Sequence, residues 1–349
     1  MIENKIEVES TPTLREINEN VKPYTQPHTG KATWQLINTL IPYFALWVLM
    51  IATVKMGYSY WITLGLAVVA SALLIRIFIF FHDCCHGSFF ASQKANRIIG
   101  FITGTMAFTA FRNWRRAHLL HHATSGNLDQ RGTGDVWTLT VDEYSSAPFY
   151  KRLGYRIFRN PLFLFGIIPS ISFYIGQRLP NPNARKADRR NLWYSNLAII
   201  GVIIAASLTI GLKTYLIIQI PIMTIAATLG IWLFYVQHQF EGVYWAREED
   251  WDPVKAALEG SSYYKLPKVL QWFTGNIGLH HVHHLNSQVP NYHLQQCLDE
   301  VKIMQSVKPV TIRESLKSLR MRLWDEDRQE LVSFRQLKRM PGFSPMNYN

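Results

Sequence analysis

The sequence predicts an all-α integral membrane protein with two transmembrane helical hairpins, four spans in all, and a cytoplasmic helical cap that carries a histidine-rich site. Three observations lead to this fold class. The chain combines 48% hydrophobic with only 17% charged residues, its apolar residues come in blocks long enough to cross a bilayer, and its histidines cluster where those blocks end.

The first hairpin is expected within residues 34–81, with spans at Trp34–Val54 and Trp61–Phe81 joined by a tight turn. Each span is long enough as a helix to cross roughly 30 Å of hydrocarbon. Arg76 lies near the end of the second span, where its side chain can reach the interface, so the chain should leave the bilayer a few residues later. Residues 1–33 are polar and contain no apolar core of the signal-peptide type, which predicts a loose cytoplasmic tail.

Residues 82–192 are expected in the cytoplasm or at the interface. The apolar run Ile98–Phe111 is too short to span a bilayer. Segment Pro161–Gln177 is just long enough, but basic residues flank it on both sides. This charge pattern favours a membrane-surface or re-entrant element over a fifth span.

The second hairpin is expected within residues 193–236, with spans at Trp193–Gly211 and Thr214–Val236. Residues 237–349 are polar with interspersed aromatic side chains, and we expect them to form the cap over the histidines. Within the cap, Thr311–Glu314 has the pattern of a capping box, and leucines at helical spacing follow as far as Leu323. An amphipathic helix is predicted there.

The charge distribution predicts the orientation. Of the 36 Lys and Arg residues, 33 lie in the two terminal regions and in the segment between the hairpins, and only two lie in the short turns. The positive-inside rule therefore places the histidine clusters and both termini in the cytoplasm of a multi-pass cell-membrane protein. The net charge of +12 follows mainly from this topology, and no nucleic-acid-binding motif accompanies it.

Three histidine clusters lie at residues 82–86, 118–122 and 280–284. Positions i, i+3 and i+4 of a helix share one face, so the His-x-x-His-His clusters at 118–122 and 280–284 can each present three imidazoles to one side. The first cluster has the i, i+4 spacing. With 12 histidines in the chain, one such triple is expected by chance on the order of 0.01 times, so two of them indicate a multivalent site.

The type and number of the candidate ligands narrow the choice of metal ion. Neutral imidazole suits Zn, Cu, Fe and Ni. Zinc sites take three or four protein ligands, whereas eight or nine nitrogens suit two six-coordinate ions that keep a position open. The Glu-x-x-His pattern of soluble di-iron bundles is absent. We therefore favour an all-histidine di-iron site, in which Asp83 is either a hydrogen-bond partner of a ligand or an exposed helix residue.

The histidine clusters and their flanks resemble the membrane fatty-acid desaturase family. The stretches that carry the resemblance are His82–Phe90, His118–His122, Gln237–Glu241 and Gly275–His284. The sequences of the segments Asn127–Asp135 and Glu259–Ser262 look most like those of the phospholipid acyl-chain, Δ5-type desaturases of bacilli. The resemblance implies nine metal ligands: His82, His86, His118, His121, His122, His238, His280, His283 and His284. His238 enters this set only through the resemblance, and His281 lies off the shared face.

The resemblance implies an oxidoreductase, an oxygen-dependent acyl-lipid desaturase that introduces a cis double bond, at Δ5, into saturated chains of membrane phospholipids and so adjusts membrane fluidity. Its cofactors would be two Fe ions, with O2 as co-substrate and an external reductant. An unactivated methylene needs a metal-based oxidant, which fits a sequence with metal ligands and no convincing nucleophile. The chain lacks Cys-x-x-Cys, a Gly-rich dinucleotide fingerprint and His-Pro-Gly-Gly, so we expect a carrier such as ferredoxin or flavodoxin to supply electrons.

Other functions remain open at this point. A membrane di-iron hydroxylase would use the same ligands. An intramembrane zinc protease would use His82–His86 in place of His-Glu-x-x-His but would leave the other clusters unexplained. A metal transporter would need ligands inside the bilayer rather than at helix exits.

Overall fold

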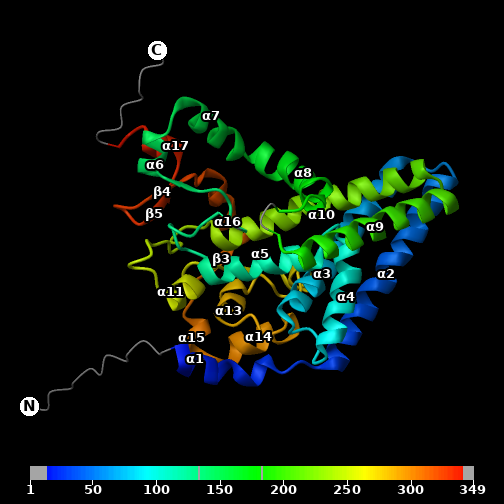
Figure 1. Cartoon of the computed structure of the whole chain (residues 1–349), viewed down its shortest axis with the longest axis horizontal. Coiled ribbons are helices and arrows are strands. Elements are labelled where there is room, and N and C mark those ends of the chain that lie inside the picture. Colours follow the sequence, from blue (N-terminus) through cyan, green and yellow to red (C-terminus); the bar gives the residue numbers. More distant parts are fainter. Residues whose placement is uncertain (1–13, 133, 182–183, 341–349) are drawn as a thin grey trace, which may run out of the picture.

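The computed structural model describes residues 14–132, 134–181 and 184–340. Figure 1 shows long helices extending together toward one end of the molecule, with short elements gathered at the other end. Among the described residues, four helices are long and apolar enough to cross a membrane, and they correspond to the four predicted spans: α2 (Thr29–Lys55), α3 (Tyr60–His86), α9 (Lys186–Thr209) and α10 (Leu212–His238).

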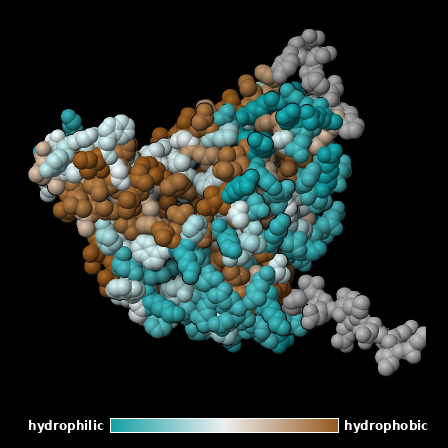
Figure 2. Space-filling model, turned by 180° about the vertical axis from the view of Figure 1, so that it is seen from behind, coloured by the Kyte–Doolittle hydropathy of each residue, from teal (hydrophilic) through white to brown (hydrophobic). Residues whose placement is uncertain are grey.

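The spans pack around α3, which contacts both α2 and α10. Small residues on α3, such as Ala67 and Ala70, are fully buried, and Ser71 donates a hydrogen bond to the carbonyl of Ile222 on α10 at 3.0 Å. The outer faces are apolar and exposed, as Leu208 on α9 shows with 83% exposure. Figure 2 shows hydrophobic residues over the end with the long helices and hydrophilic residues over the other. The exposed apolar surface of these long helices suits contact with lipid chains.

Helix α3 continues to His86, so the first histidine cluster lies on the same helix as the second span, as predicted. Gly87 then ends it in the left-handed region, with φ of 77°, a conformation that glycine adopts readily. The first histidine cluster therefore sits on the last two turns of a membrane span, and its position is fixed by the packing of that span.

Between the hairpins lie α4 (Gln93–Met106), α5 (Phe111–Thr124), β1 (Leu139–Thr140), α6 (Val141–Ser146) and α7 (Phe149–Phe158). The segment predicted to be re-entrant or superficial forms η2 (Leu162–Ile167), α8 (Ile168–Tyr174) and η3 (Gly176–Arg178). It is bent by 61° from α7, a geometry that fits either a broken span or a re-entrant loop. The membrane-surface or re-entrant interpretation stays a prediction.

The cap combines short helices with two small sheets, one of which includes β1. Its elements are α11 (Pro253–Leu258), β2 (Tyr263–Lys265), α12 (Lys268–Phe273), α13 (His280–Leu285), α14 (Asn291–Glu300), α15 (Lys302–Gln305), β3 (Pro309–Thr311), α16 (Ile312–Ser315), η4 (Leu316–Arg320), β4 (Leu323–Asp325), β5 (Glu330–Val332) and α17 (Phe334–Leu337). One sheet has the order β1-β4-β5, and β2 pairs with β3 in parallel. Strand pairs between residues far apart in sequence thus connect the parts of the cap.

The helix predicted from Thr311 to Leu323 is wrong in its second half. The capping box forms between Thr311 and Glu314, but the helical segment ends at Arg320. Leu323 lies instead in β4, fully buried and paired with Val332. The strand replaces the last helical turn because β5 supplies hydrogen bonds and an apolar surface that the local spacing does not reveal.

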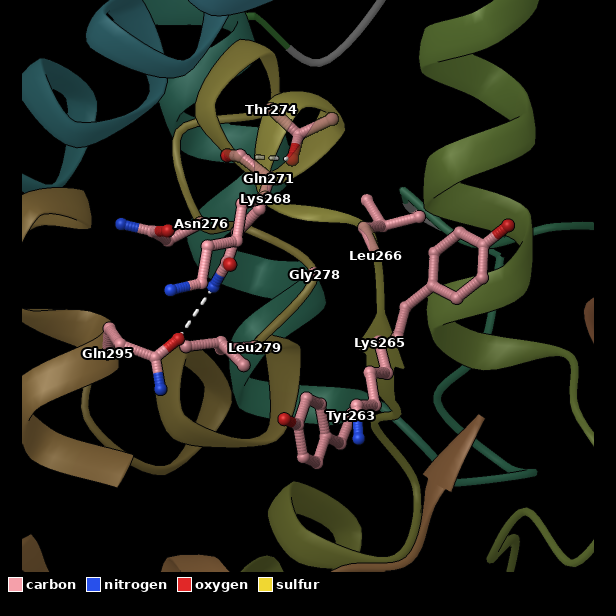
Figure 3. A pocket seen from close by; sticks show the side chains of 11 residues that line it. Tyr263, Lys265, Leu266, Lys268, Gln271, Thr274, Asn276, Gly278, Leu279 and Gln295 are labelled. Carbon is pink, nitrogen blue, oxygen red and sulfur yellow. Dashed lines mark hydrogen bonds between the residues drawn. The ribbon is translucent and has the colours of Figure 1, made fainter. Parts of the chain in front are cut away.

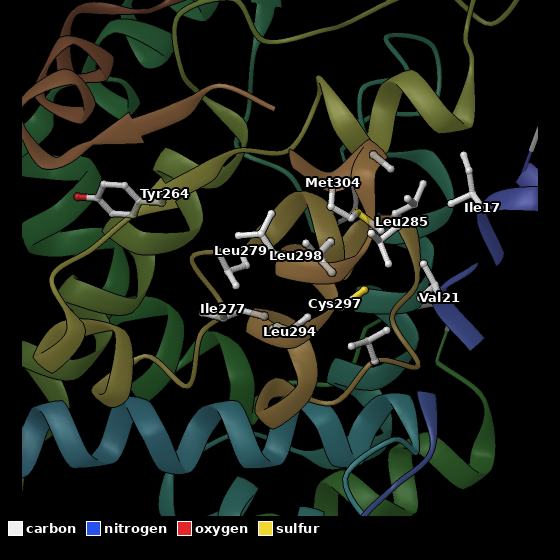
Figure 4. Packing of buried hydrophobic residues seen from close by; sticks show 14 of the residues in the cluster. Ile17, Val21, Tyr264, Ile277, Leu279, Leu285, Leu294, Cys297, Leu298 and Met304 are labelled. Carbon is white, nitrogen blue, oxygen red and sulfur yellow. The ribbon is translucent and has the colours of Figure 1, made fainter. Parts of the chain in front are cut away.

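The predicted loose N-terminal tail is also wrong within the described residues. Helix α1 (Leu14–Val21) and η1 (Lys22–Thr25) lie against the cap. Ile17 and Val21 are buried in its main apolar cluster with residues such as Leu294 and Cys297 (Figure 4). The i, i+4 spacing of these two side chains makes one face of α1 apolar, and the cap buries it.

Candidate metal centre

The structure gathers nine histidines into two neighbouring groups, each with one nitrogen per residue and all these nitrogens within 4.8 Å of one another. The five-histidine group consists of His82, His86, His118, His122 and His283. The four-histidine group consists of His121, His238, His280 and His284. These are the nine predicted ligands; that they bind iron stays a prediction.

Each His-x-x-His-His cluster divides its side chains between the groups. On α5 the i, i+4 pair His118 and His122 joins the five-histidine group, while His121 joins the other. On α13 the division is reversed, because His280 and His284 join the four-histidine group. The three imidazoles of a cluster share a helix face, as predicted, but that face spans two sites.

The groups are in direct contact. The rings of His122 and His284 stack with centroids 4.1 Å apart, and His283 and His284 lie 5.9 Å apart edge to face. Two ions held by these groups would therefore be close neighbours and could act on one bound molecule.

Carboxylates orient one histidine in each group. Asp83 Oδ1 lies 3.0 Å from His82 Nδ1, and its other oxygen accepts hydrogen bonds from the backbone and side-chain amides of Asn291 at 2.7 and 2.8 Å. Asp83 is thus the hydrogen-bond partner of a predicted ligand, one of the two roles left open by the sequence. Asp135 Oδ1 lies 2.7 Å from His121 Nδ1. Sequence reasoning missed Asp135, and its only signal was its place in the Asn127–Asp135 stretch.

His238 lies at the centre of the four-histidine group. Its Nε2 is 3.1 Å from His121 Nε2 and 3.0 Å from His280 Nε2, and its Nδ1 is 3.2 Å from the carbonyl oxygen of Gly260. The carbonyl orients the ring so that Nε2 faces the other imidazoles. No local spacing marks this histidine, because its helix, α10, contributes a single ligand.

The donor set fits metal ions. His82 Nε2 and both ring nitrogens of His86 and His283 are buried without a hydrogen-bond partner in the part of the chain that the structure describes. Each buried unsatisfied polar atom costs about 1–3 kcal/mol, a cost that a bound cation would remove.

The protonation state also suits metal binding. Burial, reinforced by neighbouring imidazoles, lowers the pKa of His118, His122 and His283 well below the ordinary value of 6.5. They are therefore neutral at pH 7, the form that binds a metal. The same burial lowers the pKa of His280 and His284.

His281 belongs to neither group, as the sequence predicts. Its Nε2 lies 3.1 Å from the carbonyl oxygen of Met304, and the side chain is fully buried on the opposite side of α13. It acts as a packed, hydrogen-bonded histidine of the cap.

A small cavity opens onto both groups from the cap. Its lining includes His122 and His284 together with Trp251, Ala256 and Ala257, and its volume is about 130 Å³. Trp251 Nε1 donates a hydrogen bond to the carbonyl of Ser125 at 3.0 Å, which holds the indole at the cavity. Small molecules that enter this cavity can therefore contact one histidine of each group.

The fold and site together are those of a membrane protein in which four candidate spans support two all-histidine groups that could hold metal ions. The family model described as fatty acid desaturase matches residues 59–304, a range that contains all nine histidines. The chain belongs to the fatty acid desaturase family, whose members are oxidoreductases that act on acyl chains.

Curated relatives cover most of the chain. A fatty acid desaturase of Bacillus subtilis is 47% identical over 331 residues, covering 95% of this chain and 94% of its own. The sn-1 acyl-lipid omega-3 desaturase (ferredoxin) of Synechocystis is 26% identical, covering 67% of this chain and 66% of its own. The sn-1 oleoyl-lipid 12-desaturase of Picosynechococcus is 23% identical, with 66% of each chain covered.

Proposed function

We propose that this protein is an oxygen-dependent acyl-lipid desaturase that introduces a cis double bond, at Δ5, into saturated chains of membrane phospholipids. The observation that carries this proposal is the pair of contiguous all-histidine groups at the ends of apolar spans. The names of two relatives specify lipid-linked acyl chains as their substrates, which supports the choice of an acyl-lipid substrate.

We infer that the nine histidines hold two Fe ions. When bound, such ions supply the power to remove hydrogen atoms from an unactivated methylene with O2 as oxidant. The residues supply the rest: neutral imidazoles bind the ions, Asp83 and Asp135 fix ring orientation, and the buried helix ends exclude water.

The site is proposed to face the cytoplasm. The positive-inside rule supports this orientation, since basic residues gather in the cap and between the hairpins. The only basic residues in the sequence of the two turns that join the spans at their opposite end are Lys55 and Lys213.

Electrons are proposed to come from a small acidic carrier such as ferredoxin or flavodoxin. Ferredoxin appears in the name of one relative. Helix α5 exposes Arg112, Arg115 and Arg116 on its outer surface while its inner face carries the histidines. A carrier bound there would be one helix away from the metal ions, and its negative charge would complement this surface.

Expression in a host without desaturases tests the reaction. We expect new monounsaturated phospholipid chains, with a bond at Δ5 located by mass spectrometry of derivatised fatty acids. A bond at another carbon would contradict the regiochemistry alone. Hydroxylated chains without an alkene would favour the hydroxylase, which uses the same ligand set.

A further inference from the structure

A second cavity, of about 160 Å³, lies in the cap beside helix α12 and is lined by neither histidine group. Its walls come from β2, α12, the loop that precedes α13, and α14. Figure 3 shows Tyr263 and Lys265 on the strand side and Lys268 on the helix side. Elements from across the cap therefore build one pocket.

Helix α12 lies against the cytoplasmic part of span α3. Arg76 of α3 donates a hydrogen bond to the carbonyl of Trp272, and its guanidinium carbon lies 4.2 Å from the centre of the Trp272 ring. Val269 and Leu270 of α12 are exposed by 68% and 44%. Exposed apolar side chains next to a lysine, on a helix packed against the end of a span, are typical of an element at the bilayer interface. The pocket behind α12 thus lies at the depth of lipid headgroups.

The pocket is positively charged. Lys265 and Lys268 line it, and no Asp or Glu does. Within the described residues, neither lysine forms an ion pair. The nearby carboxylate of Asp299 accepts a hydrogen bond from Gln295, whose own side-chain oxygen accepts one from Gln271 at 2.6 Å. The ammonium groups of Lys265 and Lys268 and the hydroxyl of Tyr263 can therefore bind an anion in the pocket.

One wall of the pocket is directly connected in sequence to the candidate metal centre. Gly278 and Leu279 line the pocket and immediately precede the ligand His280. The Gly278 carbonyl accepts a hydrogen bond from the amide of Tyr264 in β2 at 2.7 Å. A side chain at Gly278 would clash, because its Cβ would lie 2.6 Å from the Tyr264 carbonyl oxygen. This close backbone contact fixes the pocket relative to His280.

We propose that this pocket binds the phosphate of an anionic glycerophospholipid, with Lys265 and Lys268 as its cationic partners. The inference rests on the proposed acyl-lipid substrate. Two lysines and no carboxylate line the pocket, so it favours headgroups whose only charge is the negative phosphate, such as phosphoglycerol, over choline or ethanolamine headgroups. A phosphate held here anchors the glycerol end of the lipid beside the metal centre, which favours a double bond near the carboxyl end of the chain.

Lipid binding to the purified, iron-loaded enzyme in detergent tests the proposal. Short-chain dioctanoyl phosphatidylglycerol, dioctanoyl phosphatidylcholine and inorganic phosphate are titrated separately by calorimetry. We expect phosphatidylglycerol to bind more tightly than the other two, and to lose about tenfold or more in affinity in the Lys265→Glu/Lys268→Glu variant. The Lys265→Gln/Lys268→Gln variant should show a smaller loss, and it keeps the test valid if charge reversal disturbs folding.

The matched control is Lys255→Glu, the same charge change on α11, outside the pocket lining. Unchanged affinity in both lysine-pair variants would overturn the proposal. Phosphatidylcholine bound as tightly as phosphatidylglycerol would overturn the anionic selectivity, and phosphate bound as tightly as the lipid would indicate a small-anion site instead. Desaturation of phospholipid chains by the wild type is measured separately, so failure of the proposed function is distinguished from failure of this pocket.

Discussion

The five-histidine group and the four-histidine group both consist of histidines, but the carboxylates that orient those histidines are held in place differently. In the five-histidine group, Asp83 is 2% exposed and is held by Asn291, which is fully buried and also accepts a hydrogen bond from Gln35 of α2. In the four-histidine group, Asp135 lies in a loop, and among the described residues its second oxygen accepts one hydrogen bond, of 3.4 Å, from the amide of Gly132. One group is fixed by packed helices and the other partly by a loop.

The difference suggests a division of roles. For six-coordinate ions, five protein ligands leave one position and four leave two. The ion in the four-histidine group should therefore be the more open to exogenous ligands and the easier to remove, whereas the ion in the five-histidine group should be the better retained.

Removal of one ligand from each group should have the largest effect. We expect His121→Ala and His283→Ala to abolish desaturation in membranes, because each removes a metal–nitrogen bond that no neighbouring residue replaces. Iron loss should be greater for His121→Ala, which leaves three ligands, than for His283→Ala, which leaves four. Full activity of either variant would remove that histidine from the ligand set.

Substitution of the two carboxylates should have the next largest effect. Asp83→Asn and Asp135→Asn should each weaken metal binding by about 10- to 100-fold, the usual effect of losing a ligand's hydrogen-bond partner. Only Asp83→Asn should also lower the melting temperature of the metal-free protein, because it disrupts the buried contact with Asn291. Equal melting temperatures for the two variants would contradict the difference in support.

Chelation kinetics should separate the groups in the unmodified protein. A ferrous chelator added to the purified enzyme should extract iron in two phases of similar amplitude, the faster from the four-histidine group. Asp135→Asn should speed the fast phase and leave the slow phase unchanged. A single phase in both proteins would mean that the groups release their ions together.

His281 provides the smallest expected effect. His281→Ala removes the hydrogen bond to Met304 and buried volume, so it should lower the free energy of unfolding by about 1–3 kcal/mol. Its iron content should equal that of the wild type. Loss of iron at unchanged stability would place His281 among the ligands.

The sequence predicted the spans and most of the grouped histidines because both are local signals. Apolar blocks and i, i+3, i+4 spacing can be read within one helix, as at His118–His122. The assignment of His121 to a different group from His118 depends on how α5 meets α10 and α13, which no local spacing encodes.

Other features depended on distant partners. Asp135 reaches His121 from a loop, Leu323 joins a strand because β5 lies beside it, and α1 is ordered because the cap buries Ile17. In each case the free energy comes from a tertiary contact, so the sequence near the residue gave little indication.

Metal analysis of the purified protein, with protein quantified by amino-acid analysis, tests the central claim most directly. We expect two irons per chain in the wild type and about one in His238→Ala, which removes the central histidine of the four-histidine group. One zinc per chain, a labile mixture of metals, or two irons retained in His238→Ala would contradict the proposed di-iron site.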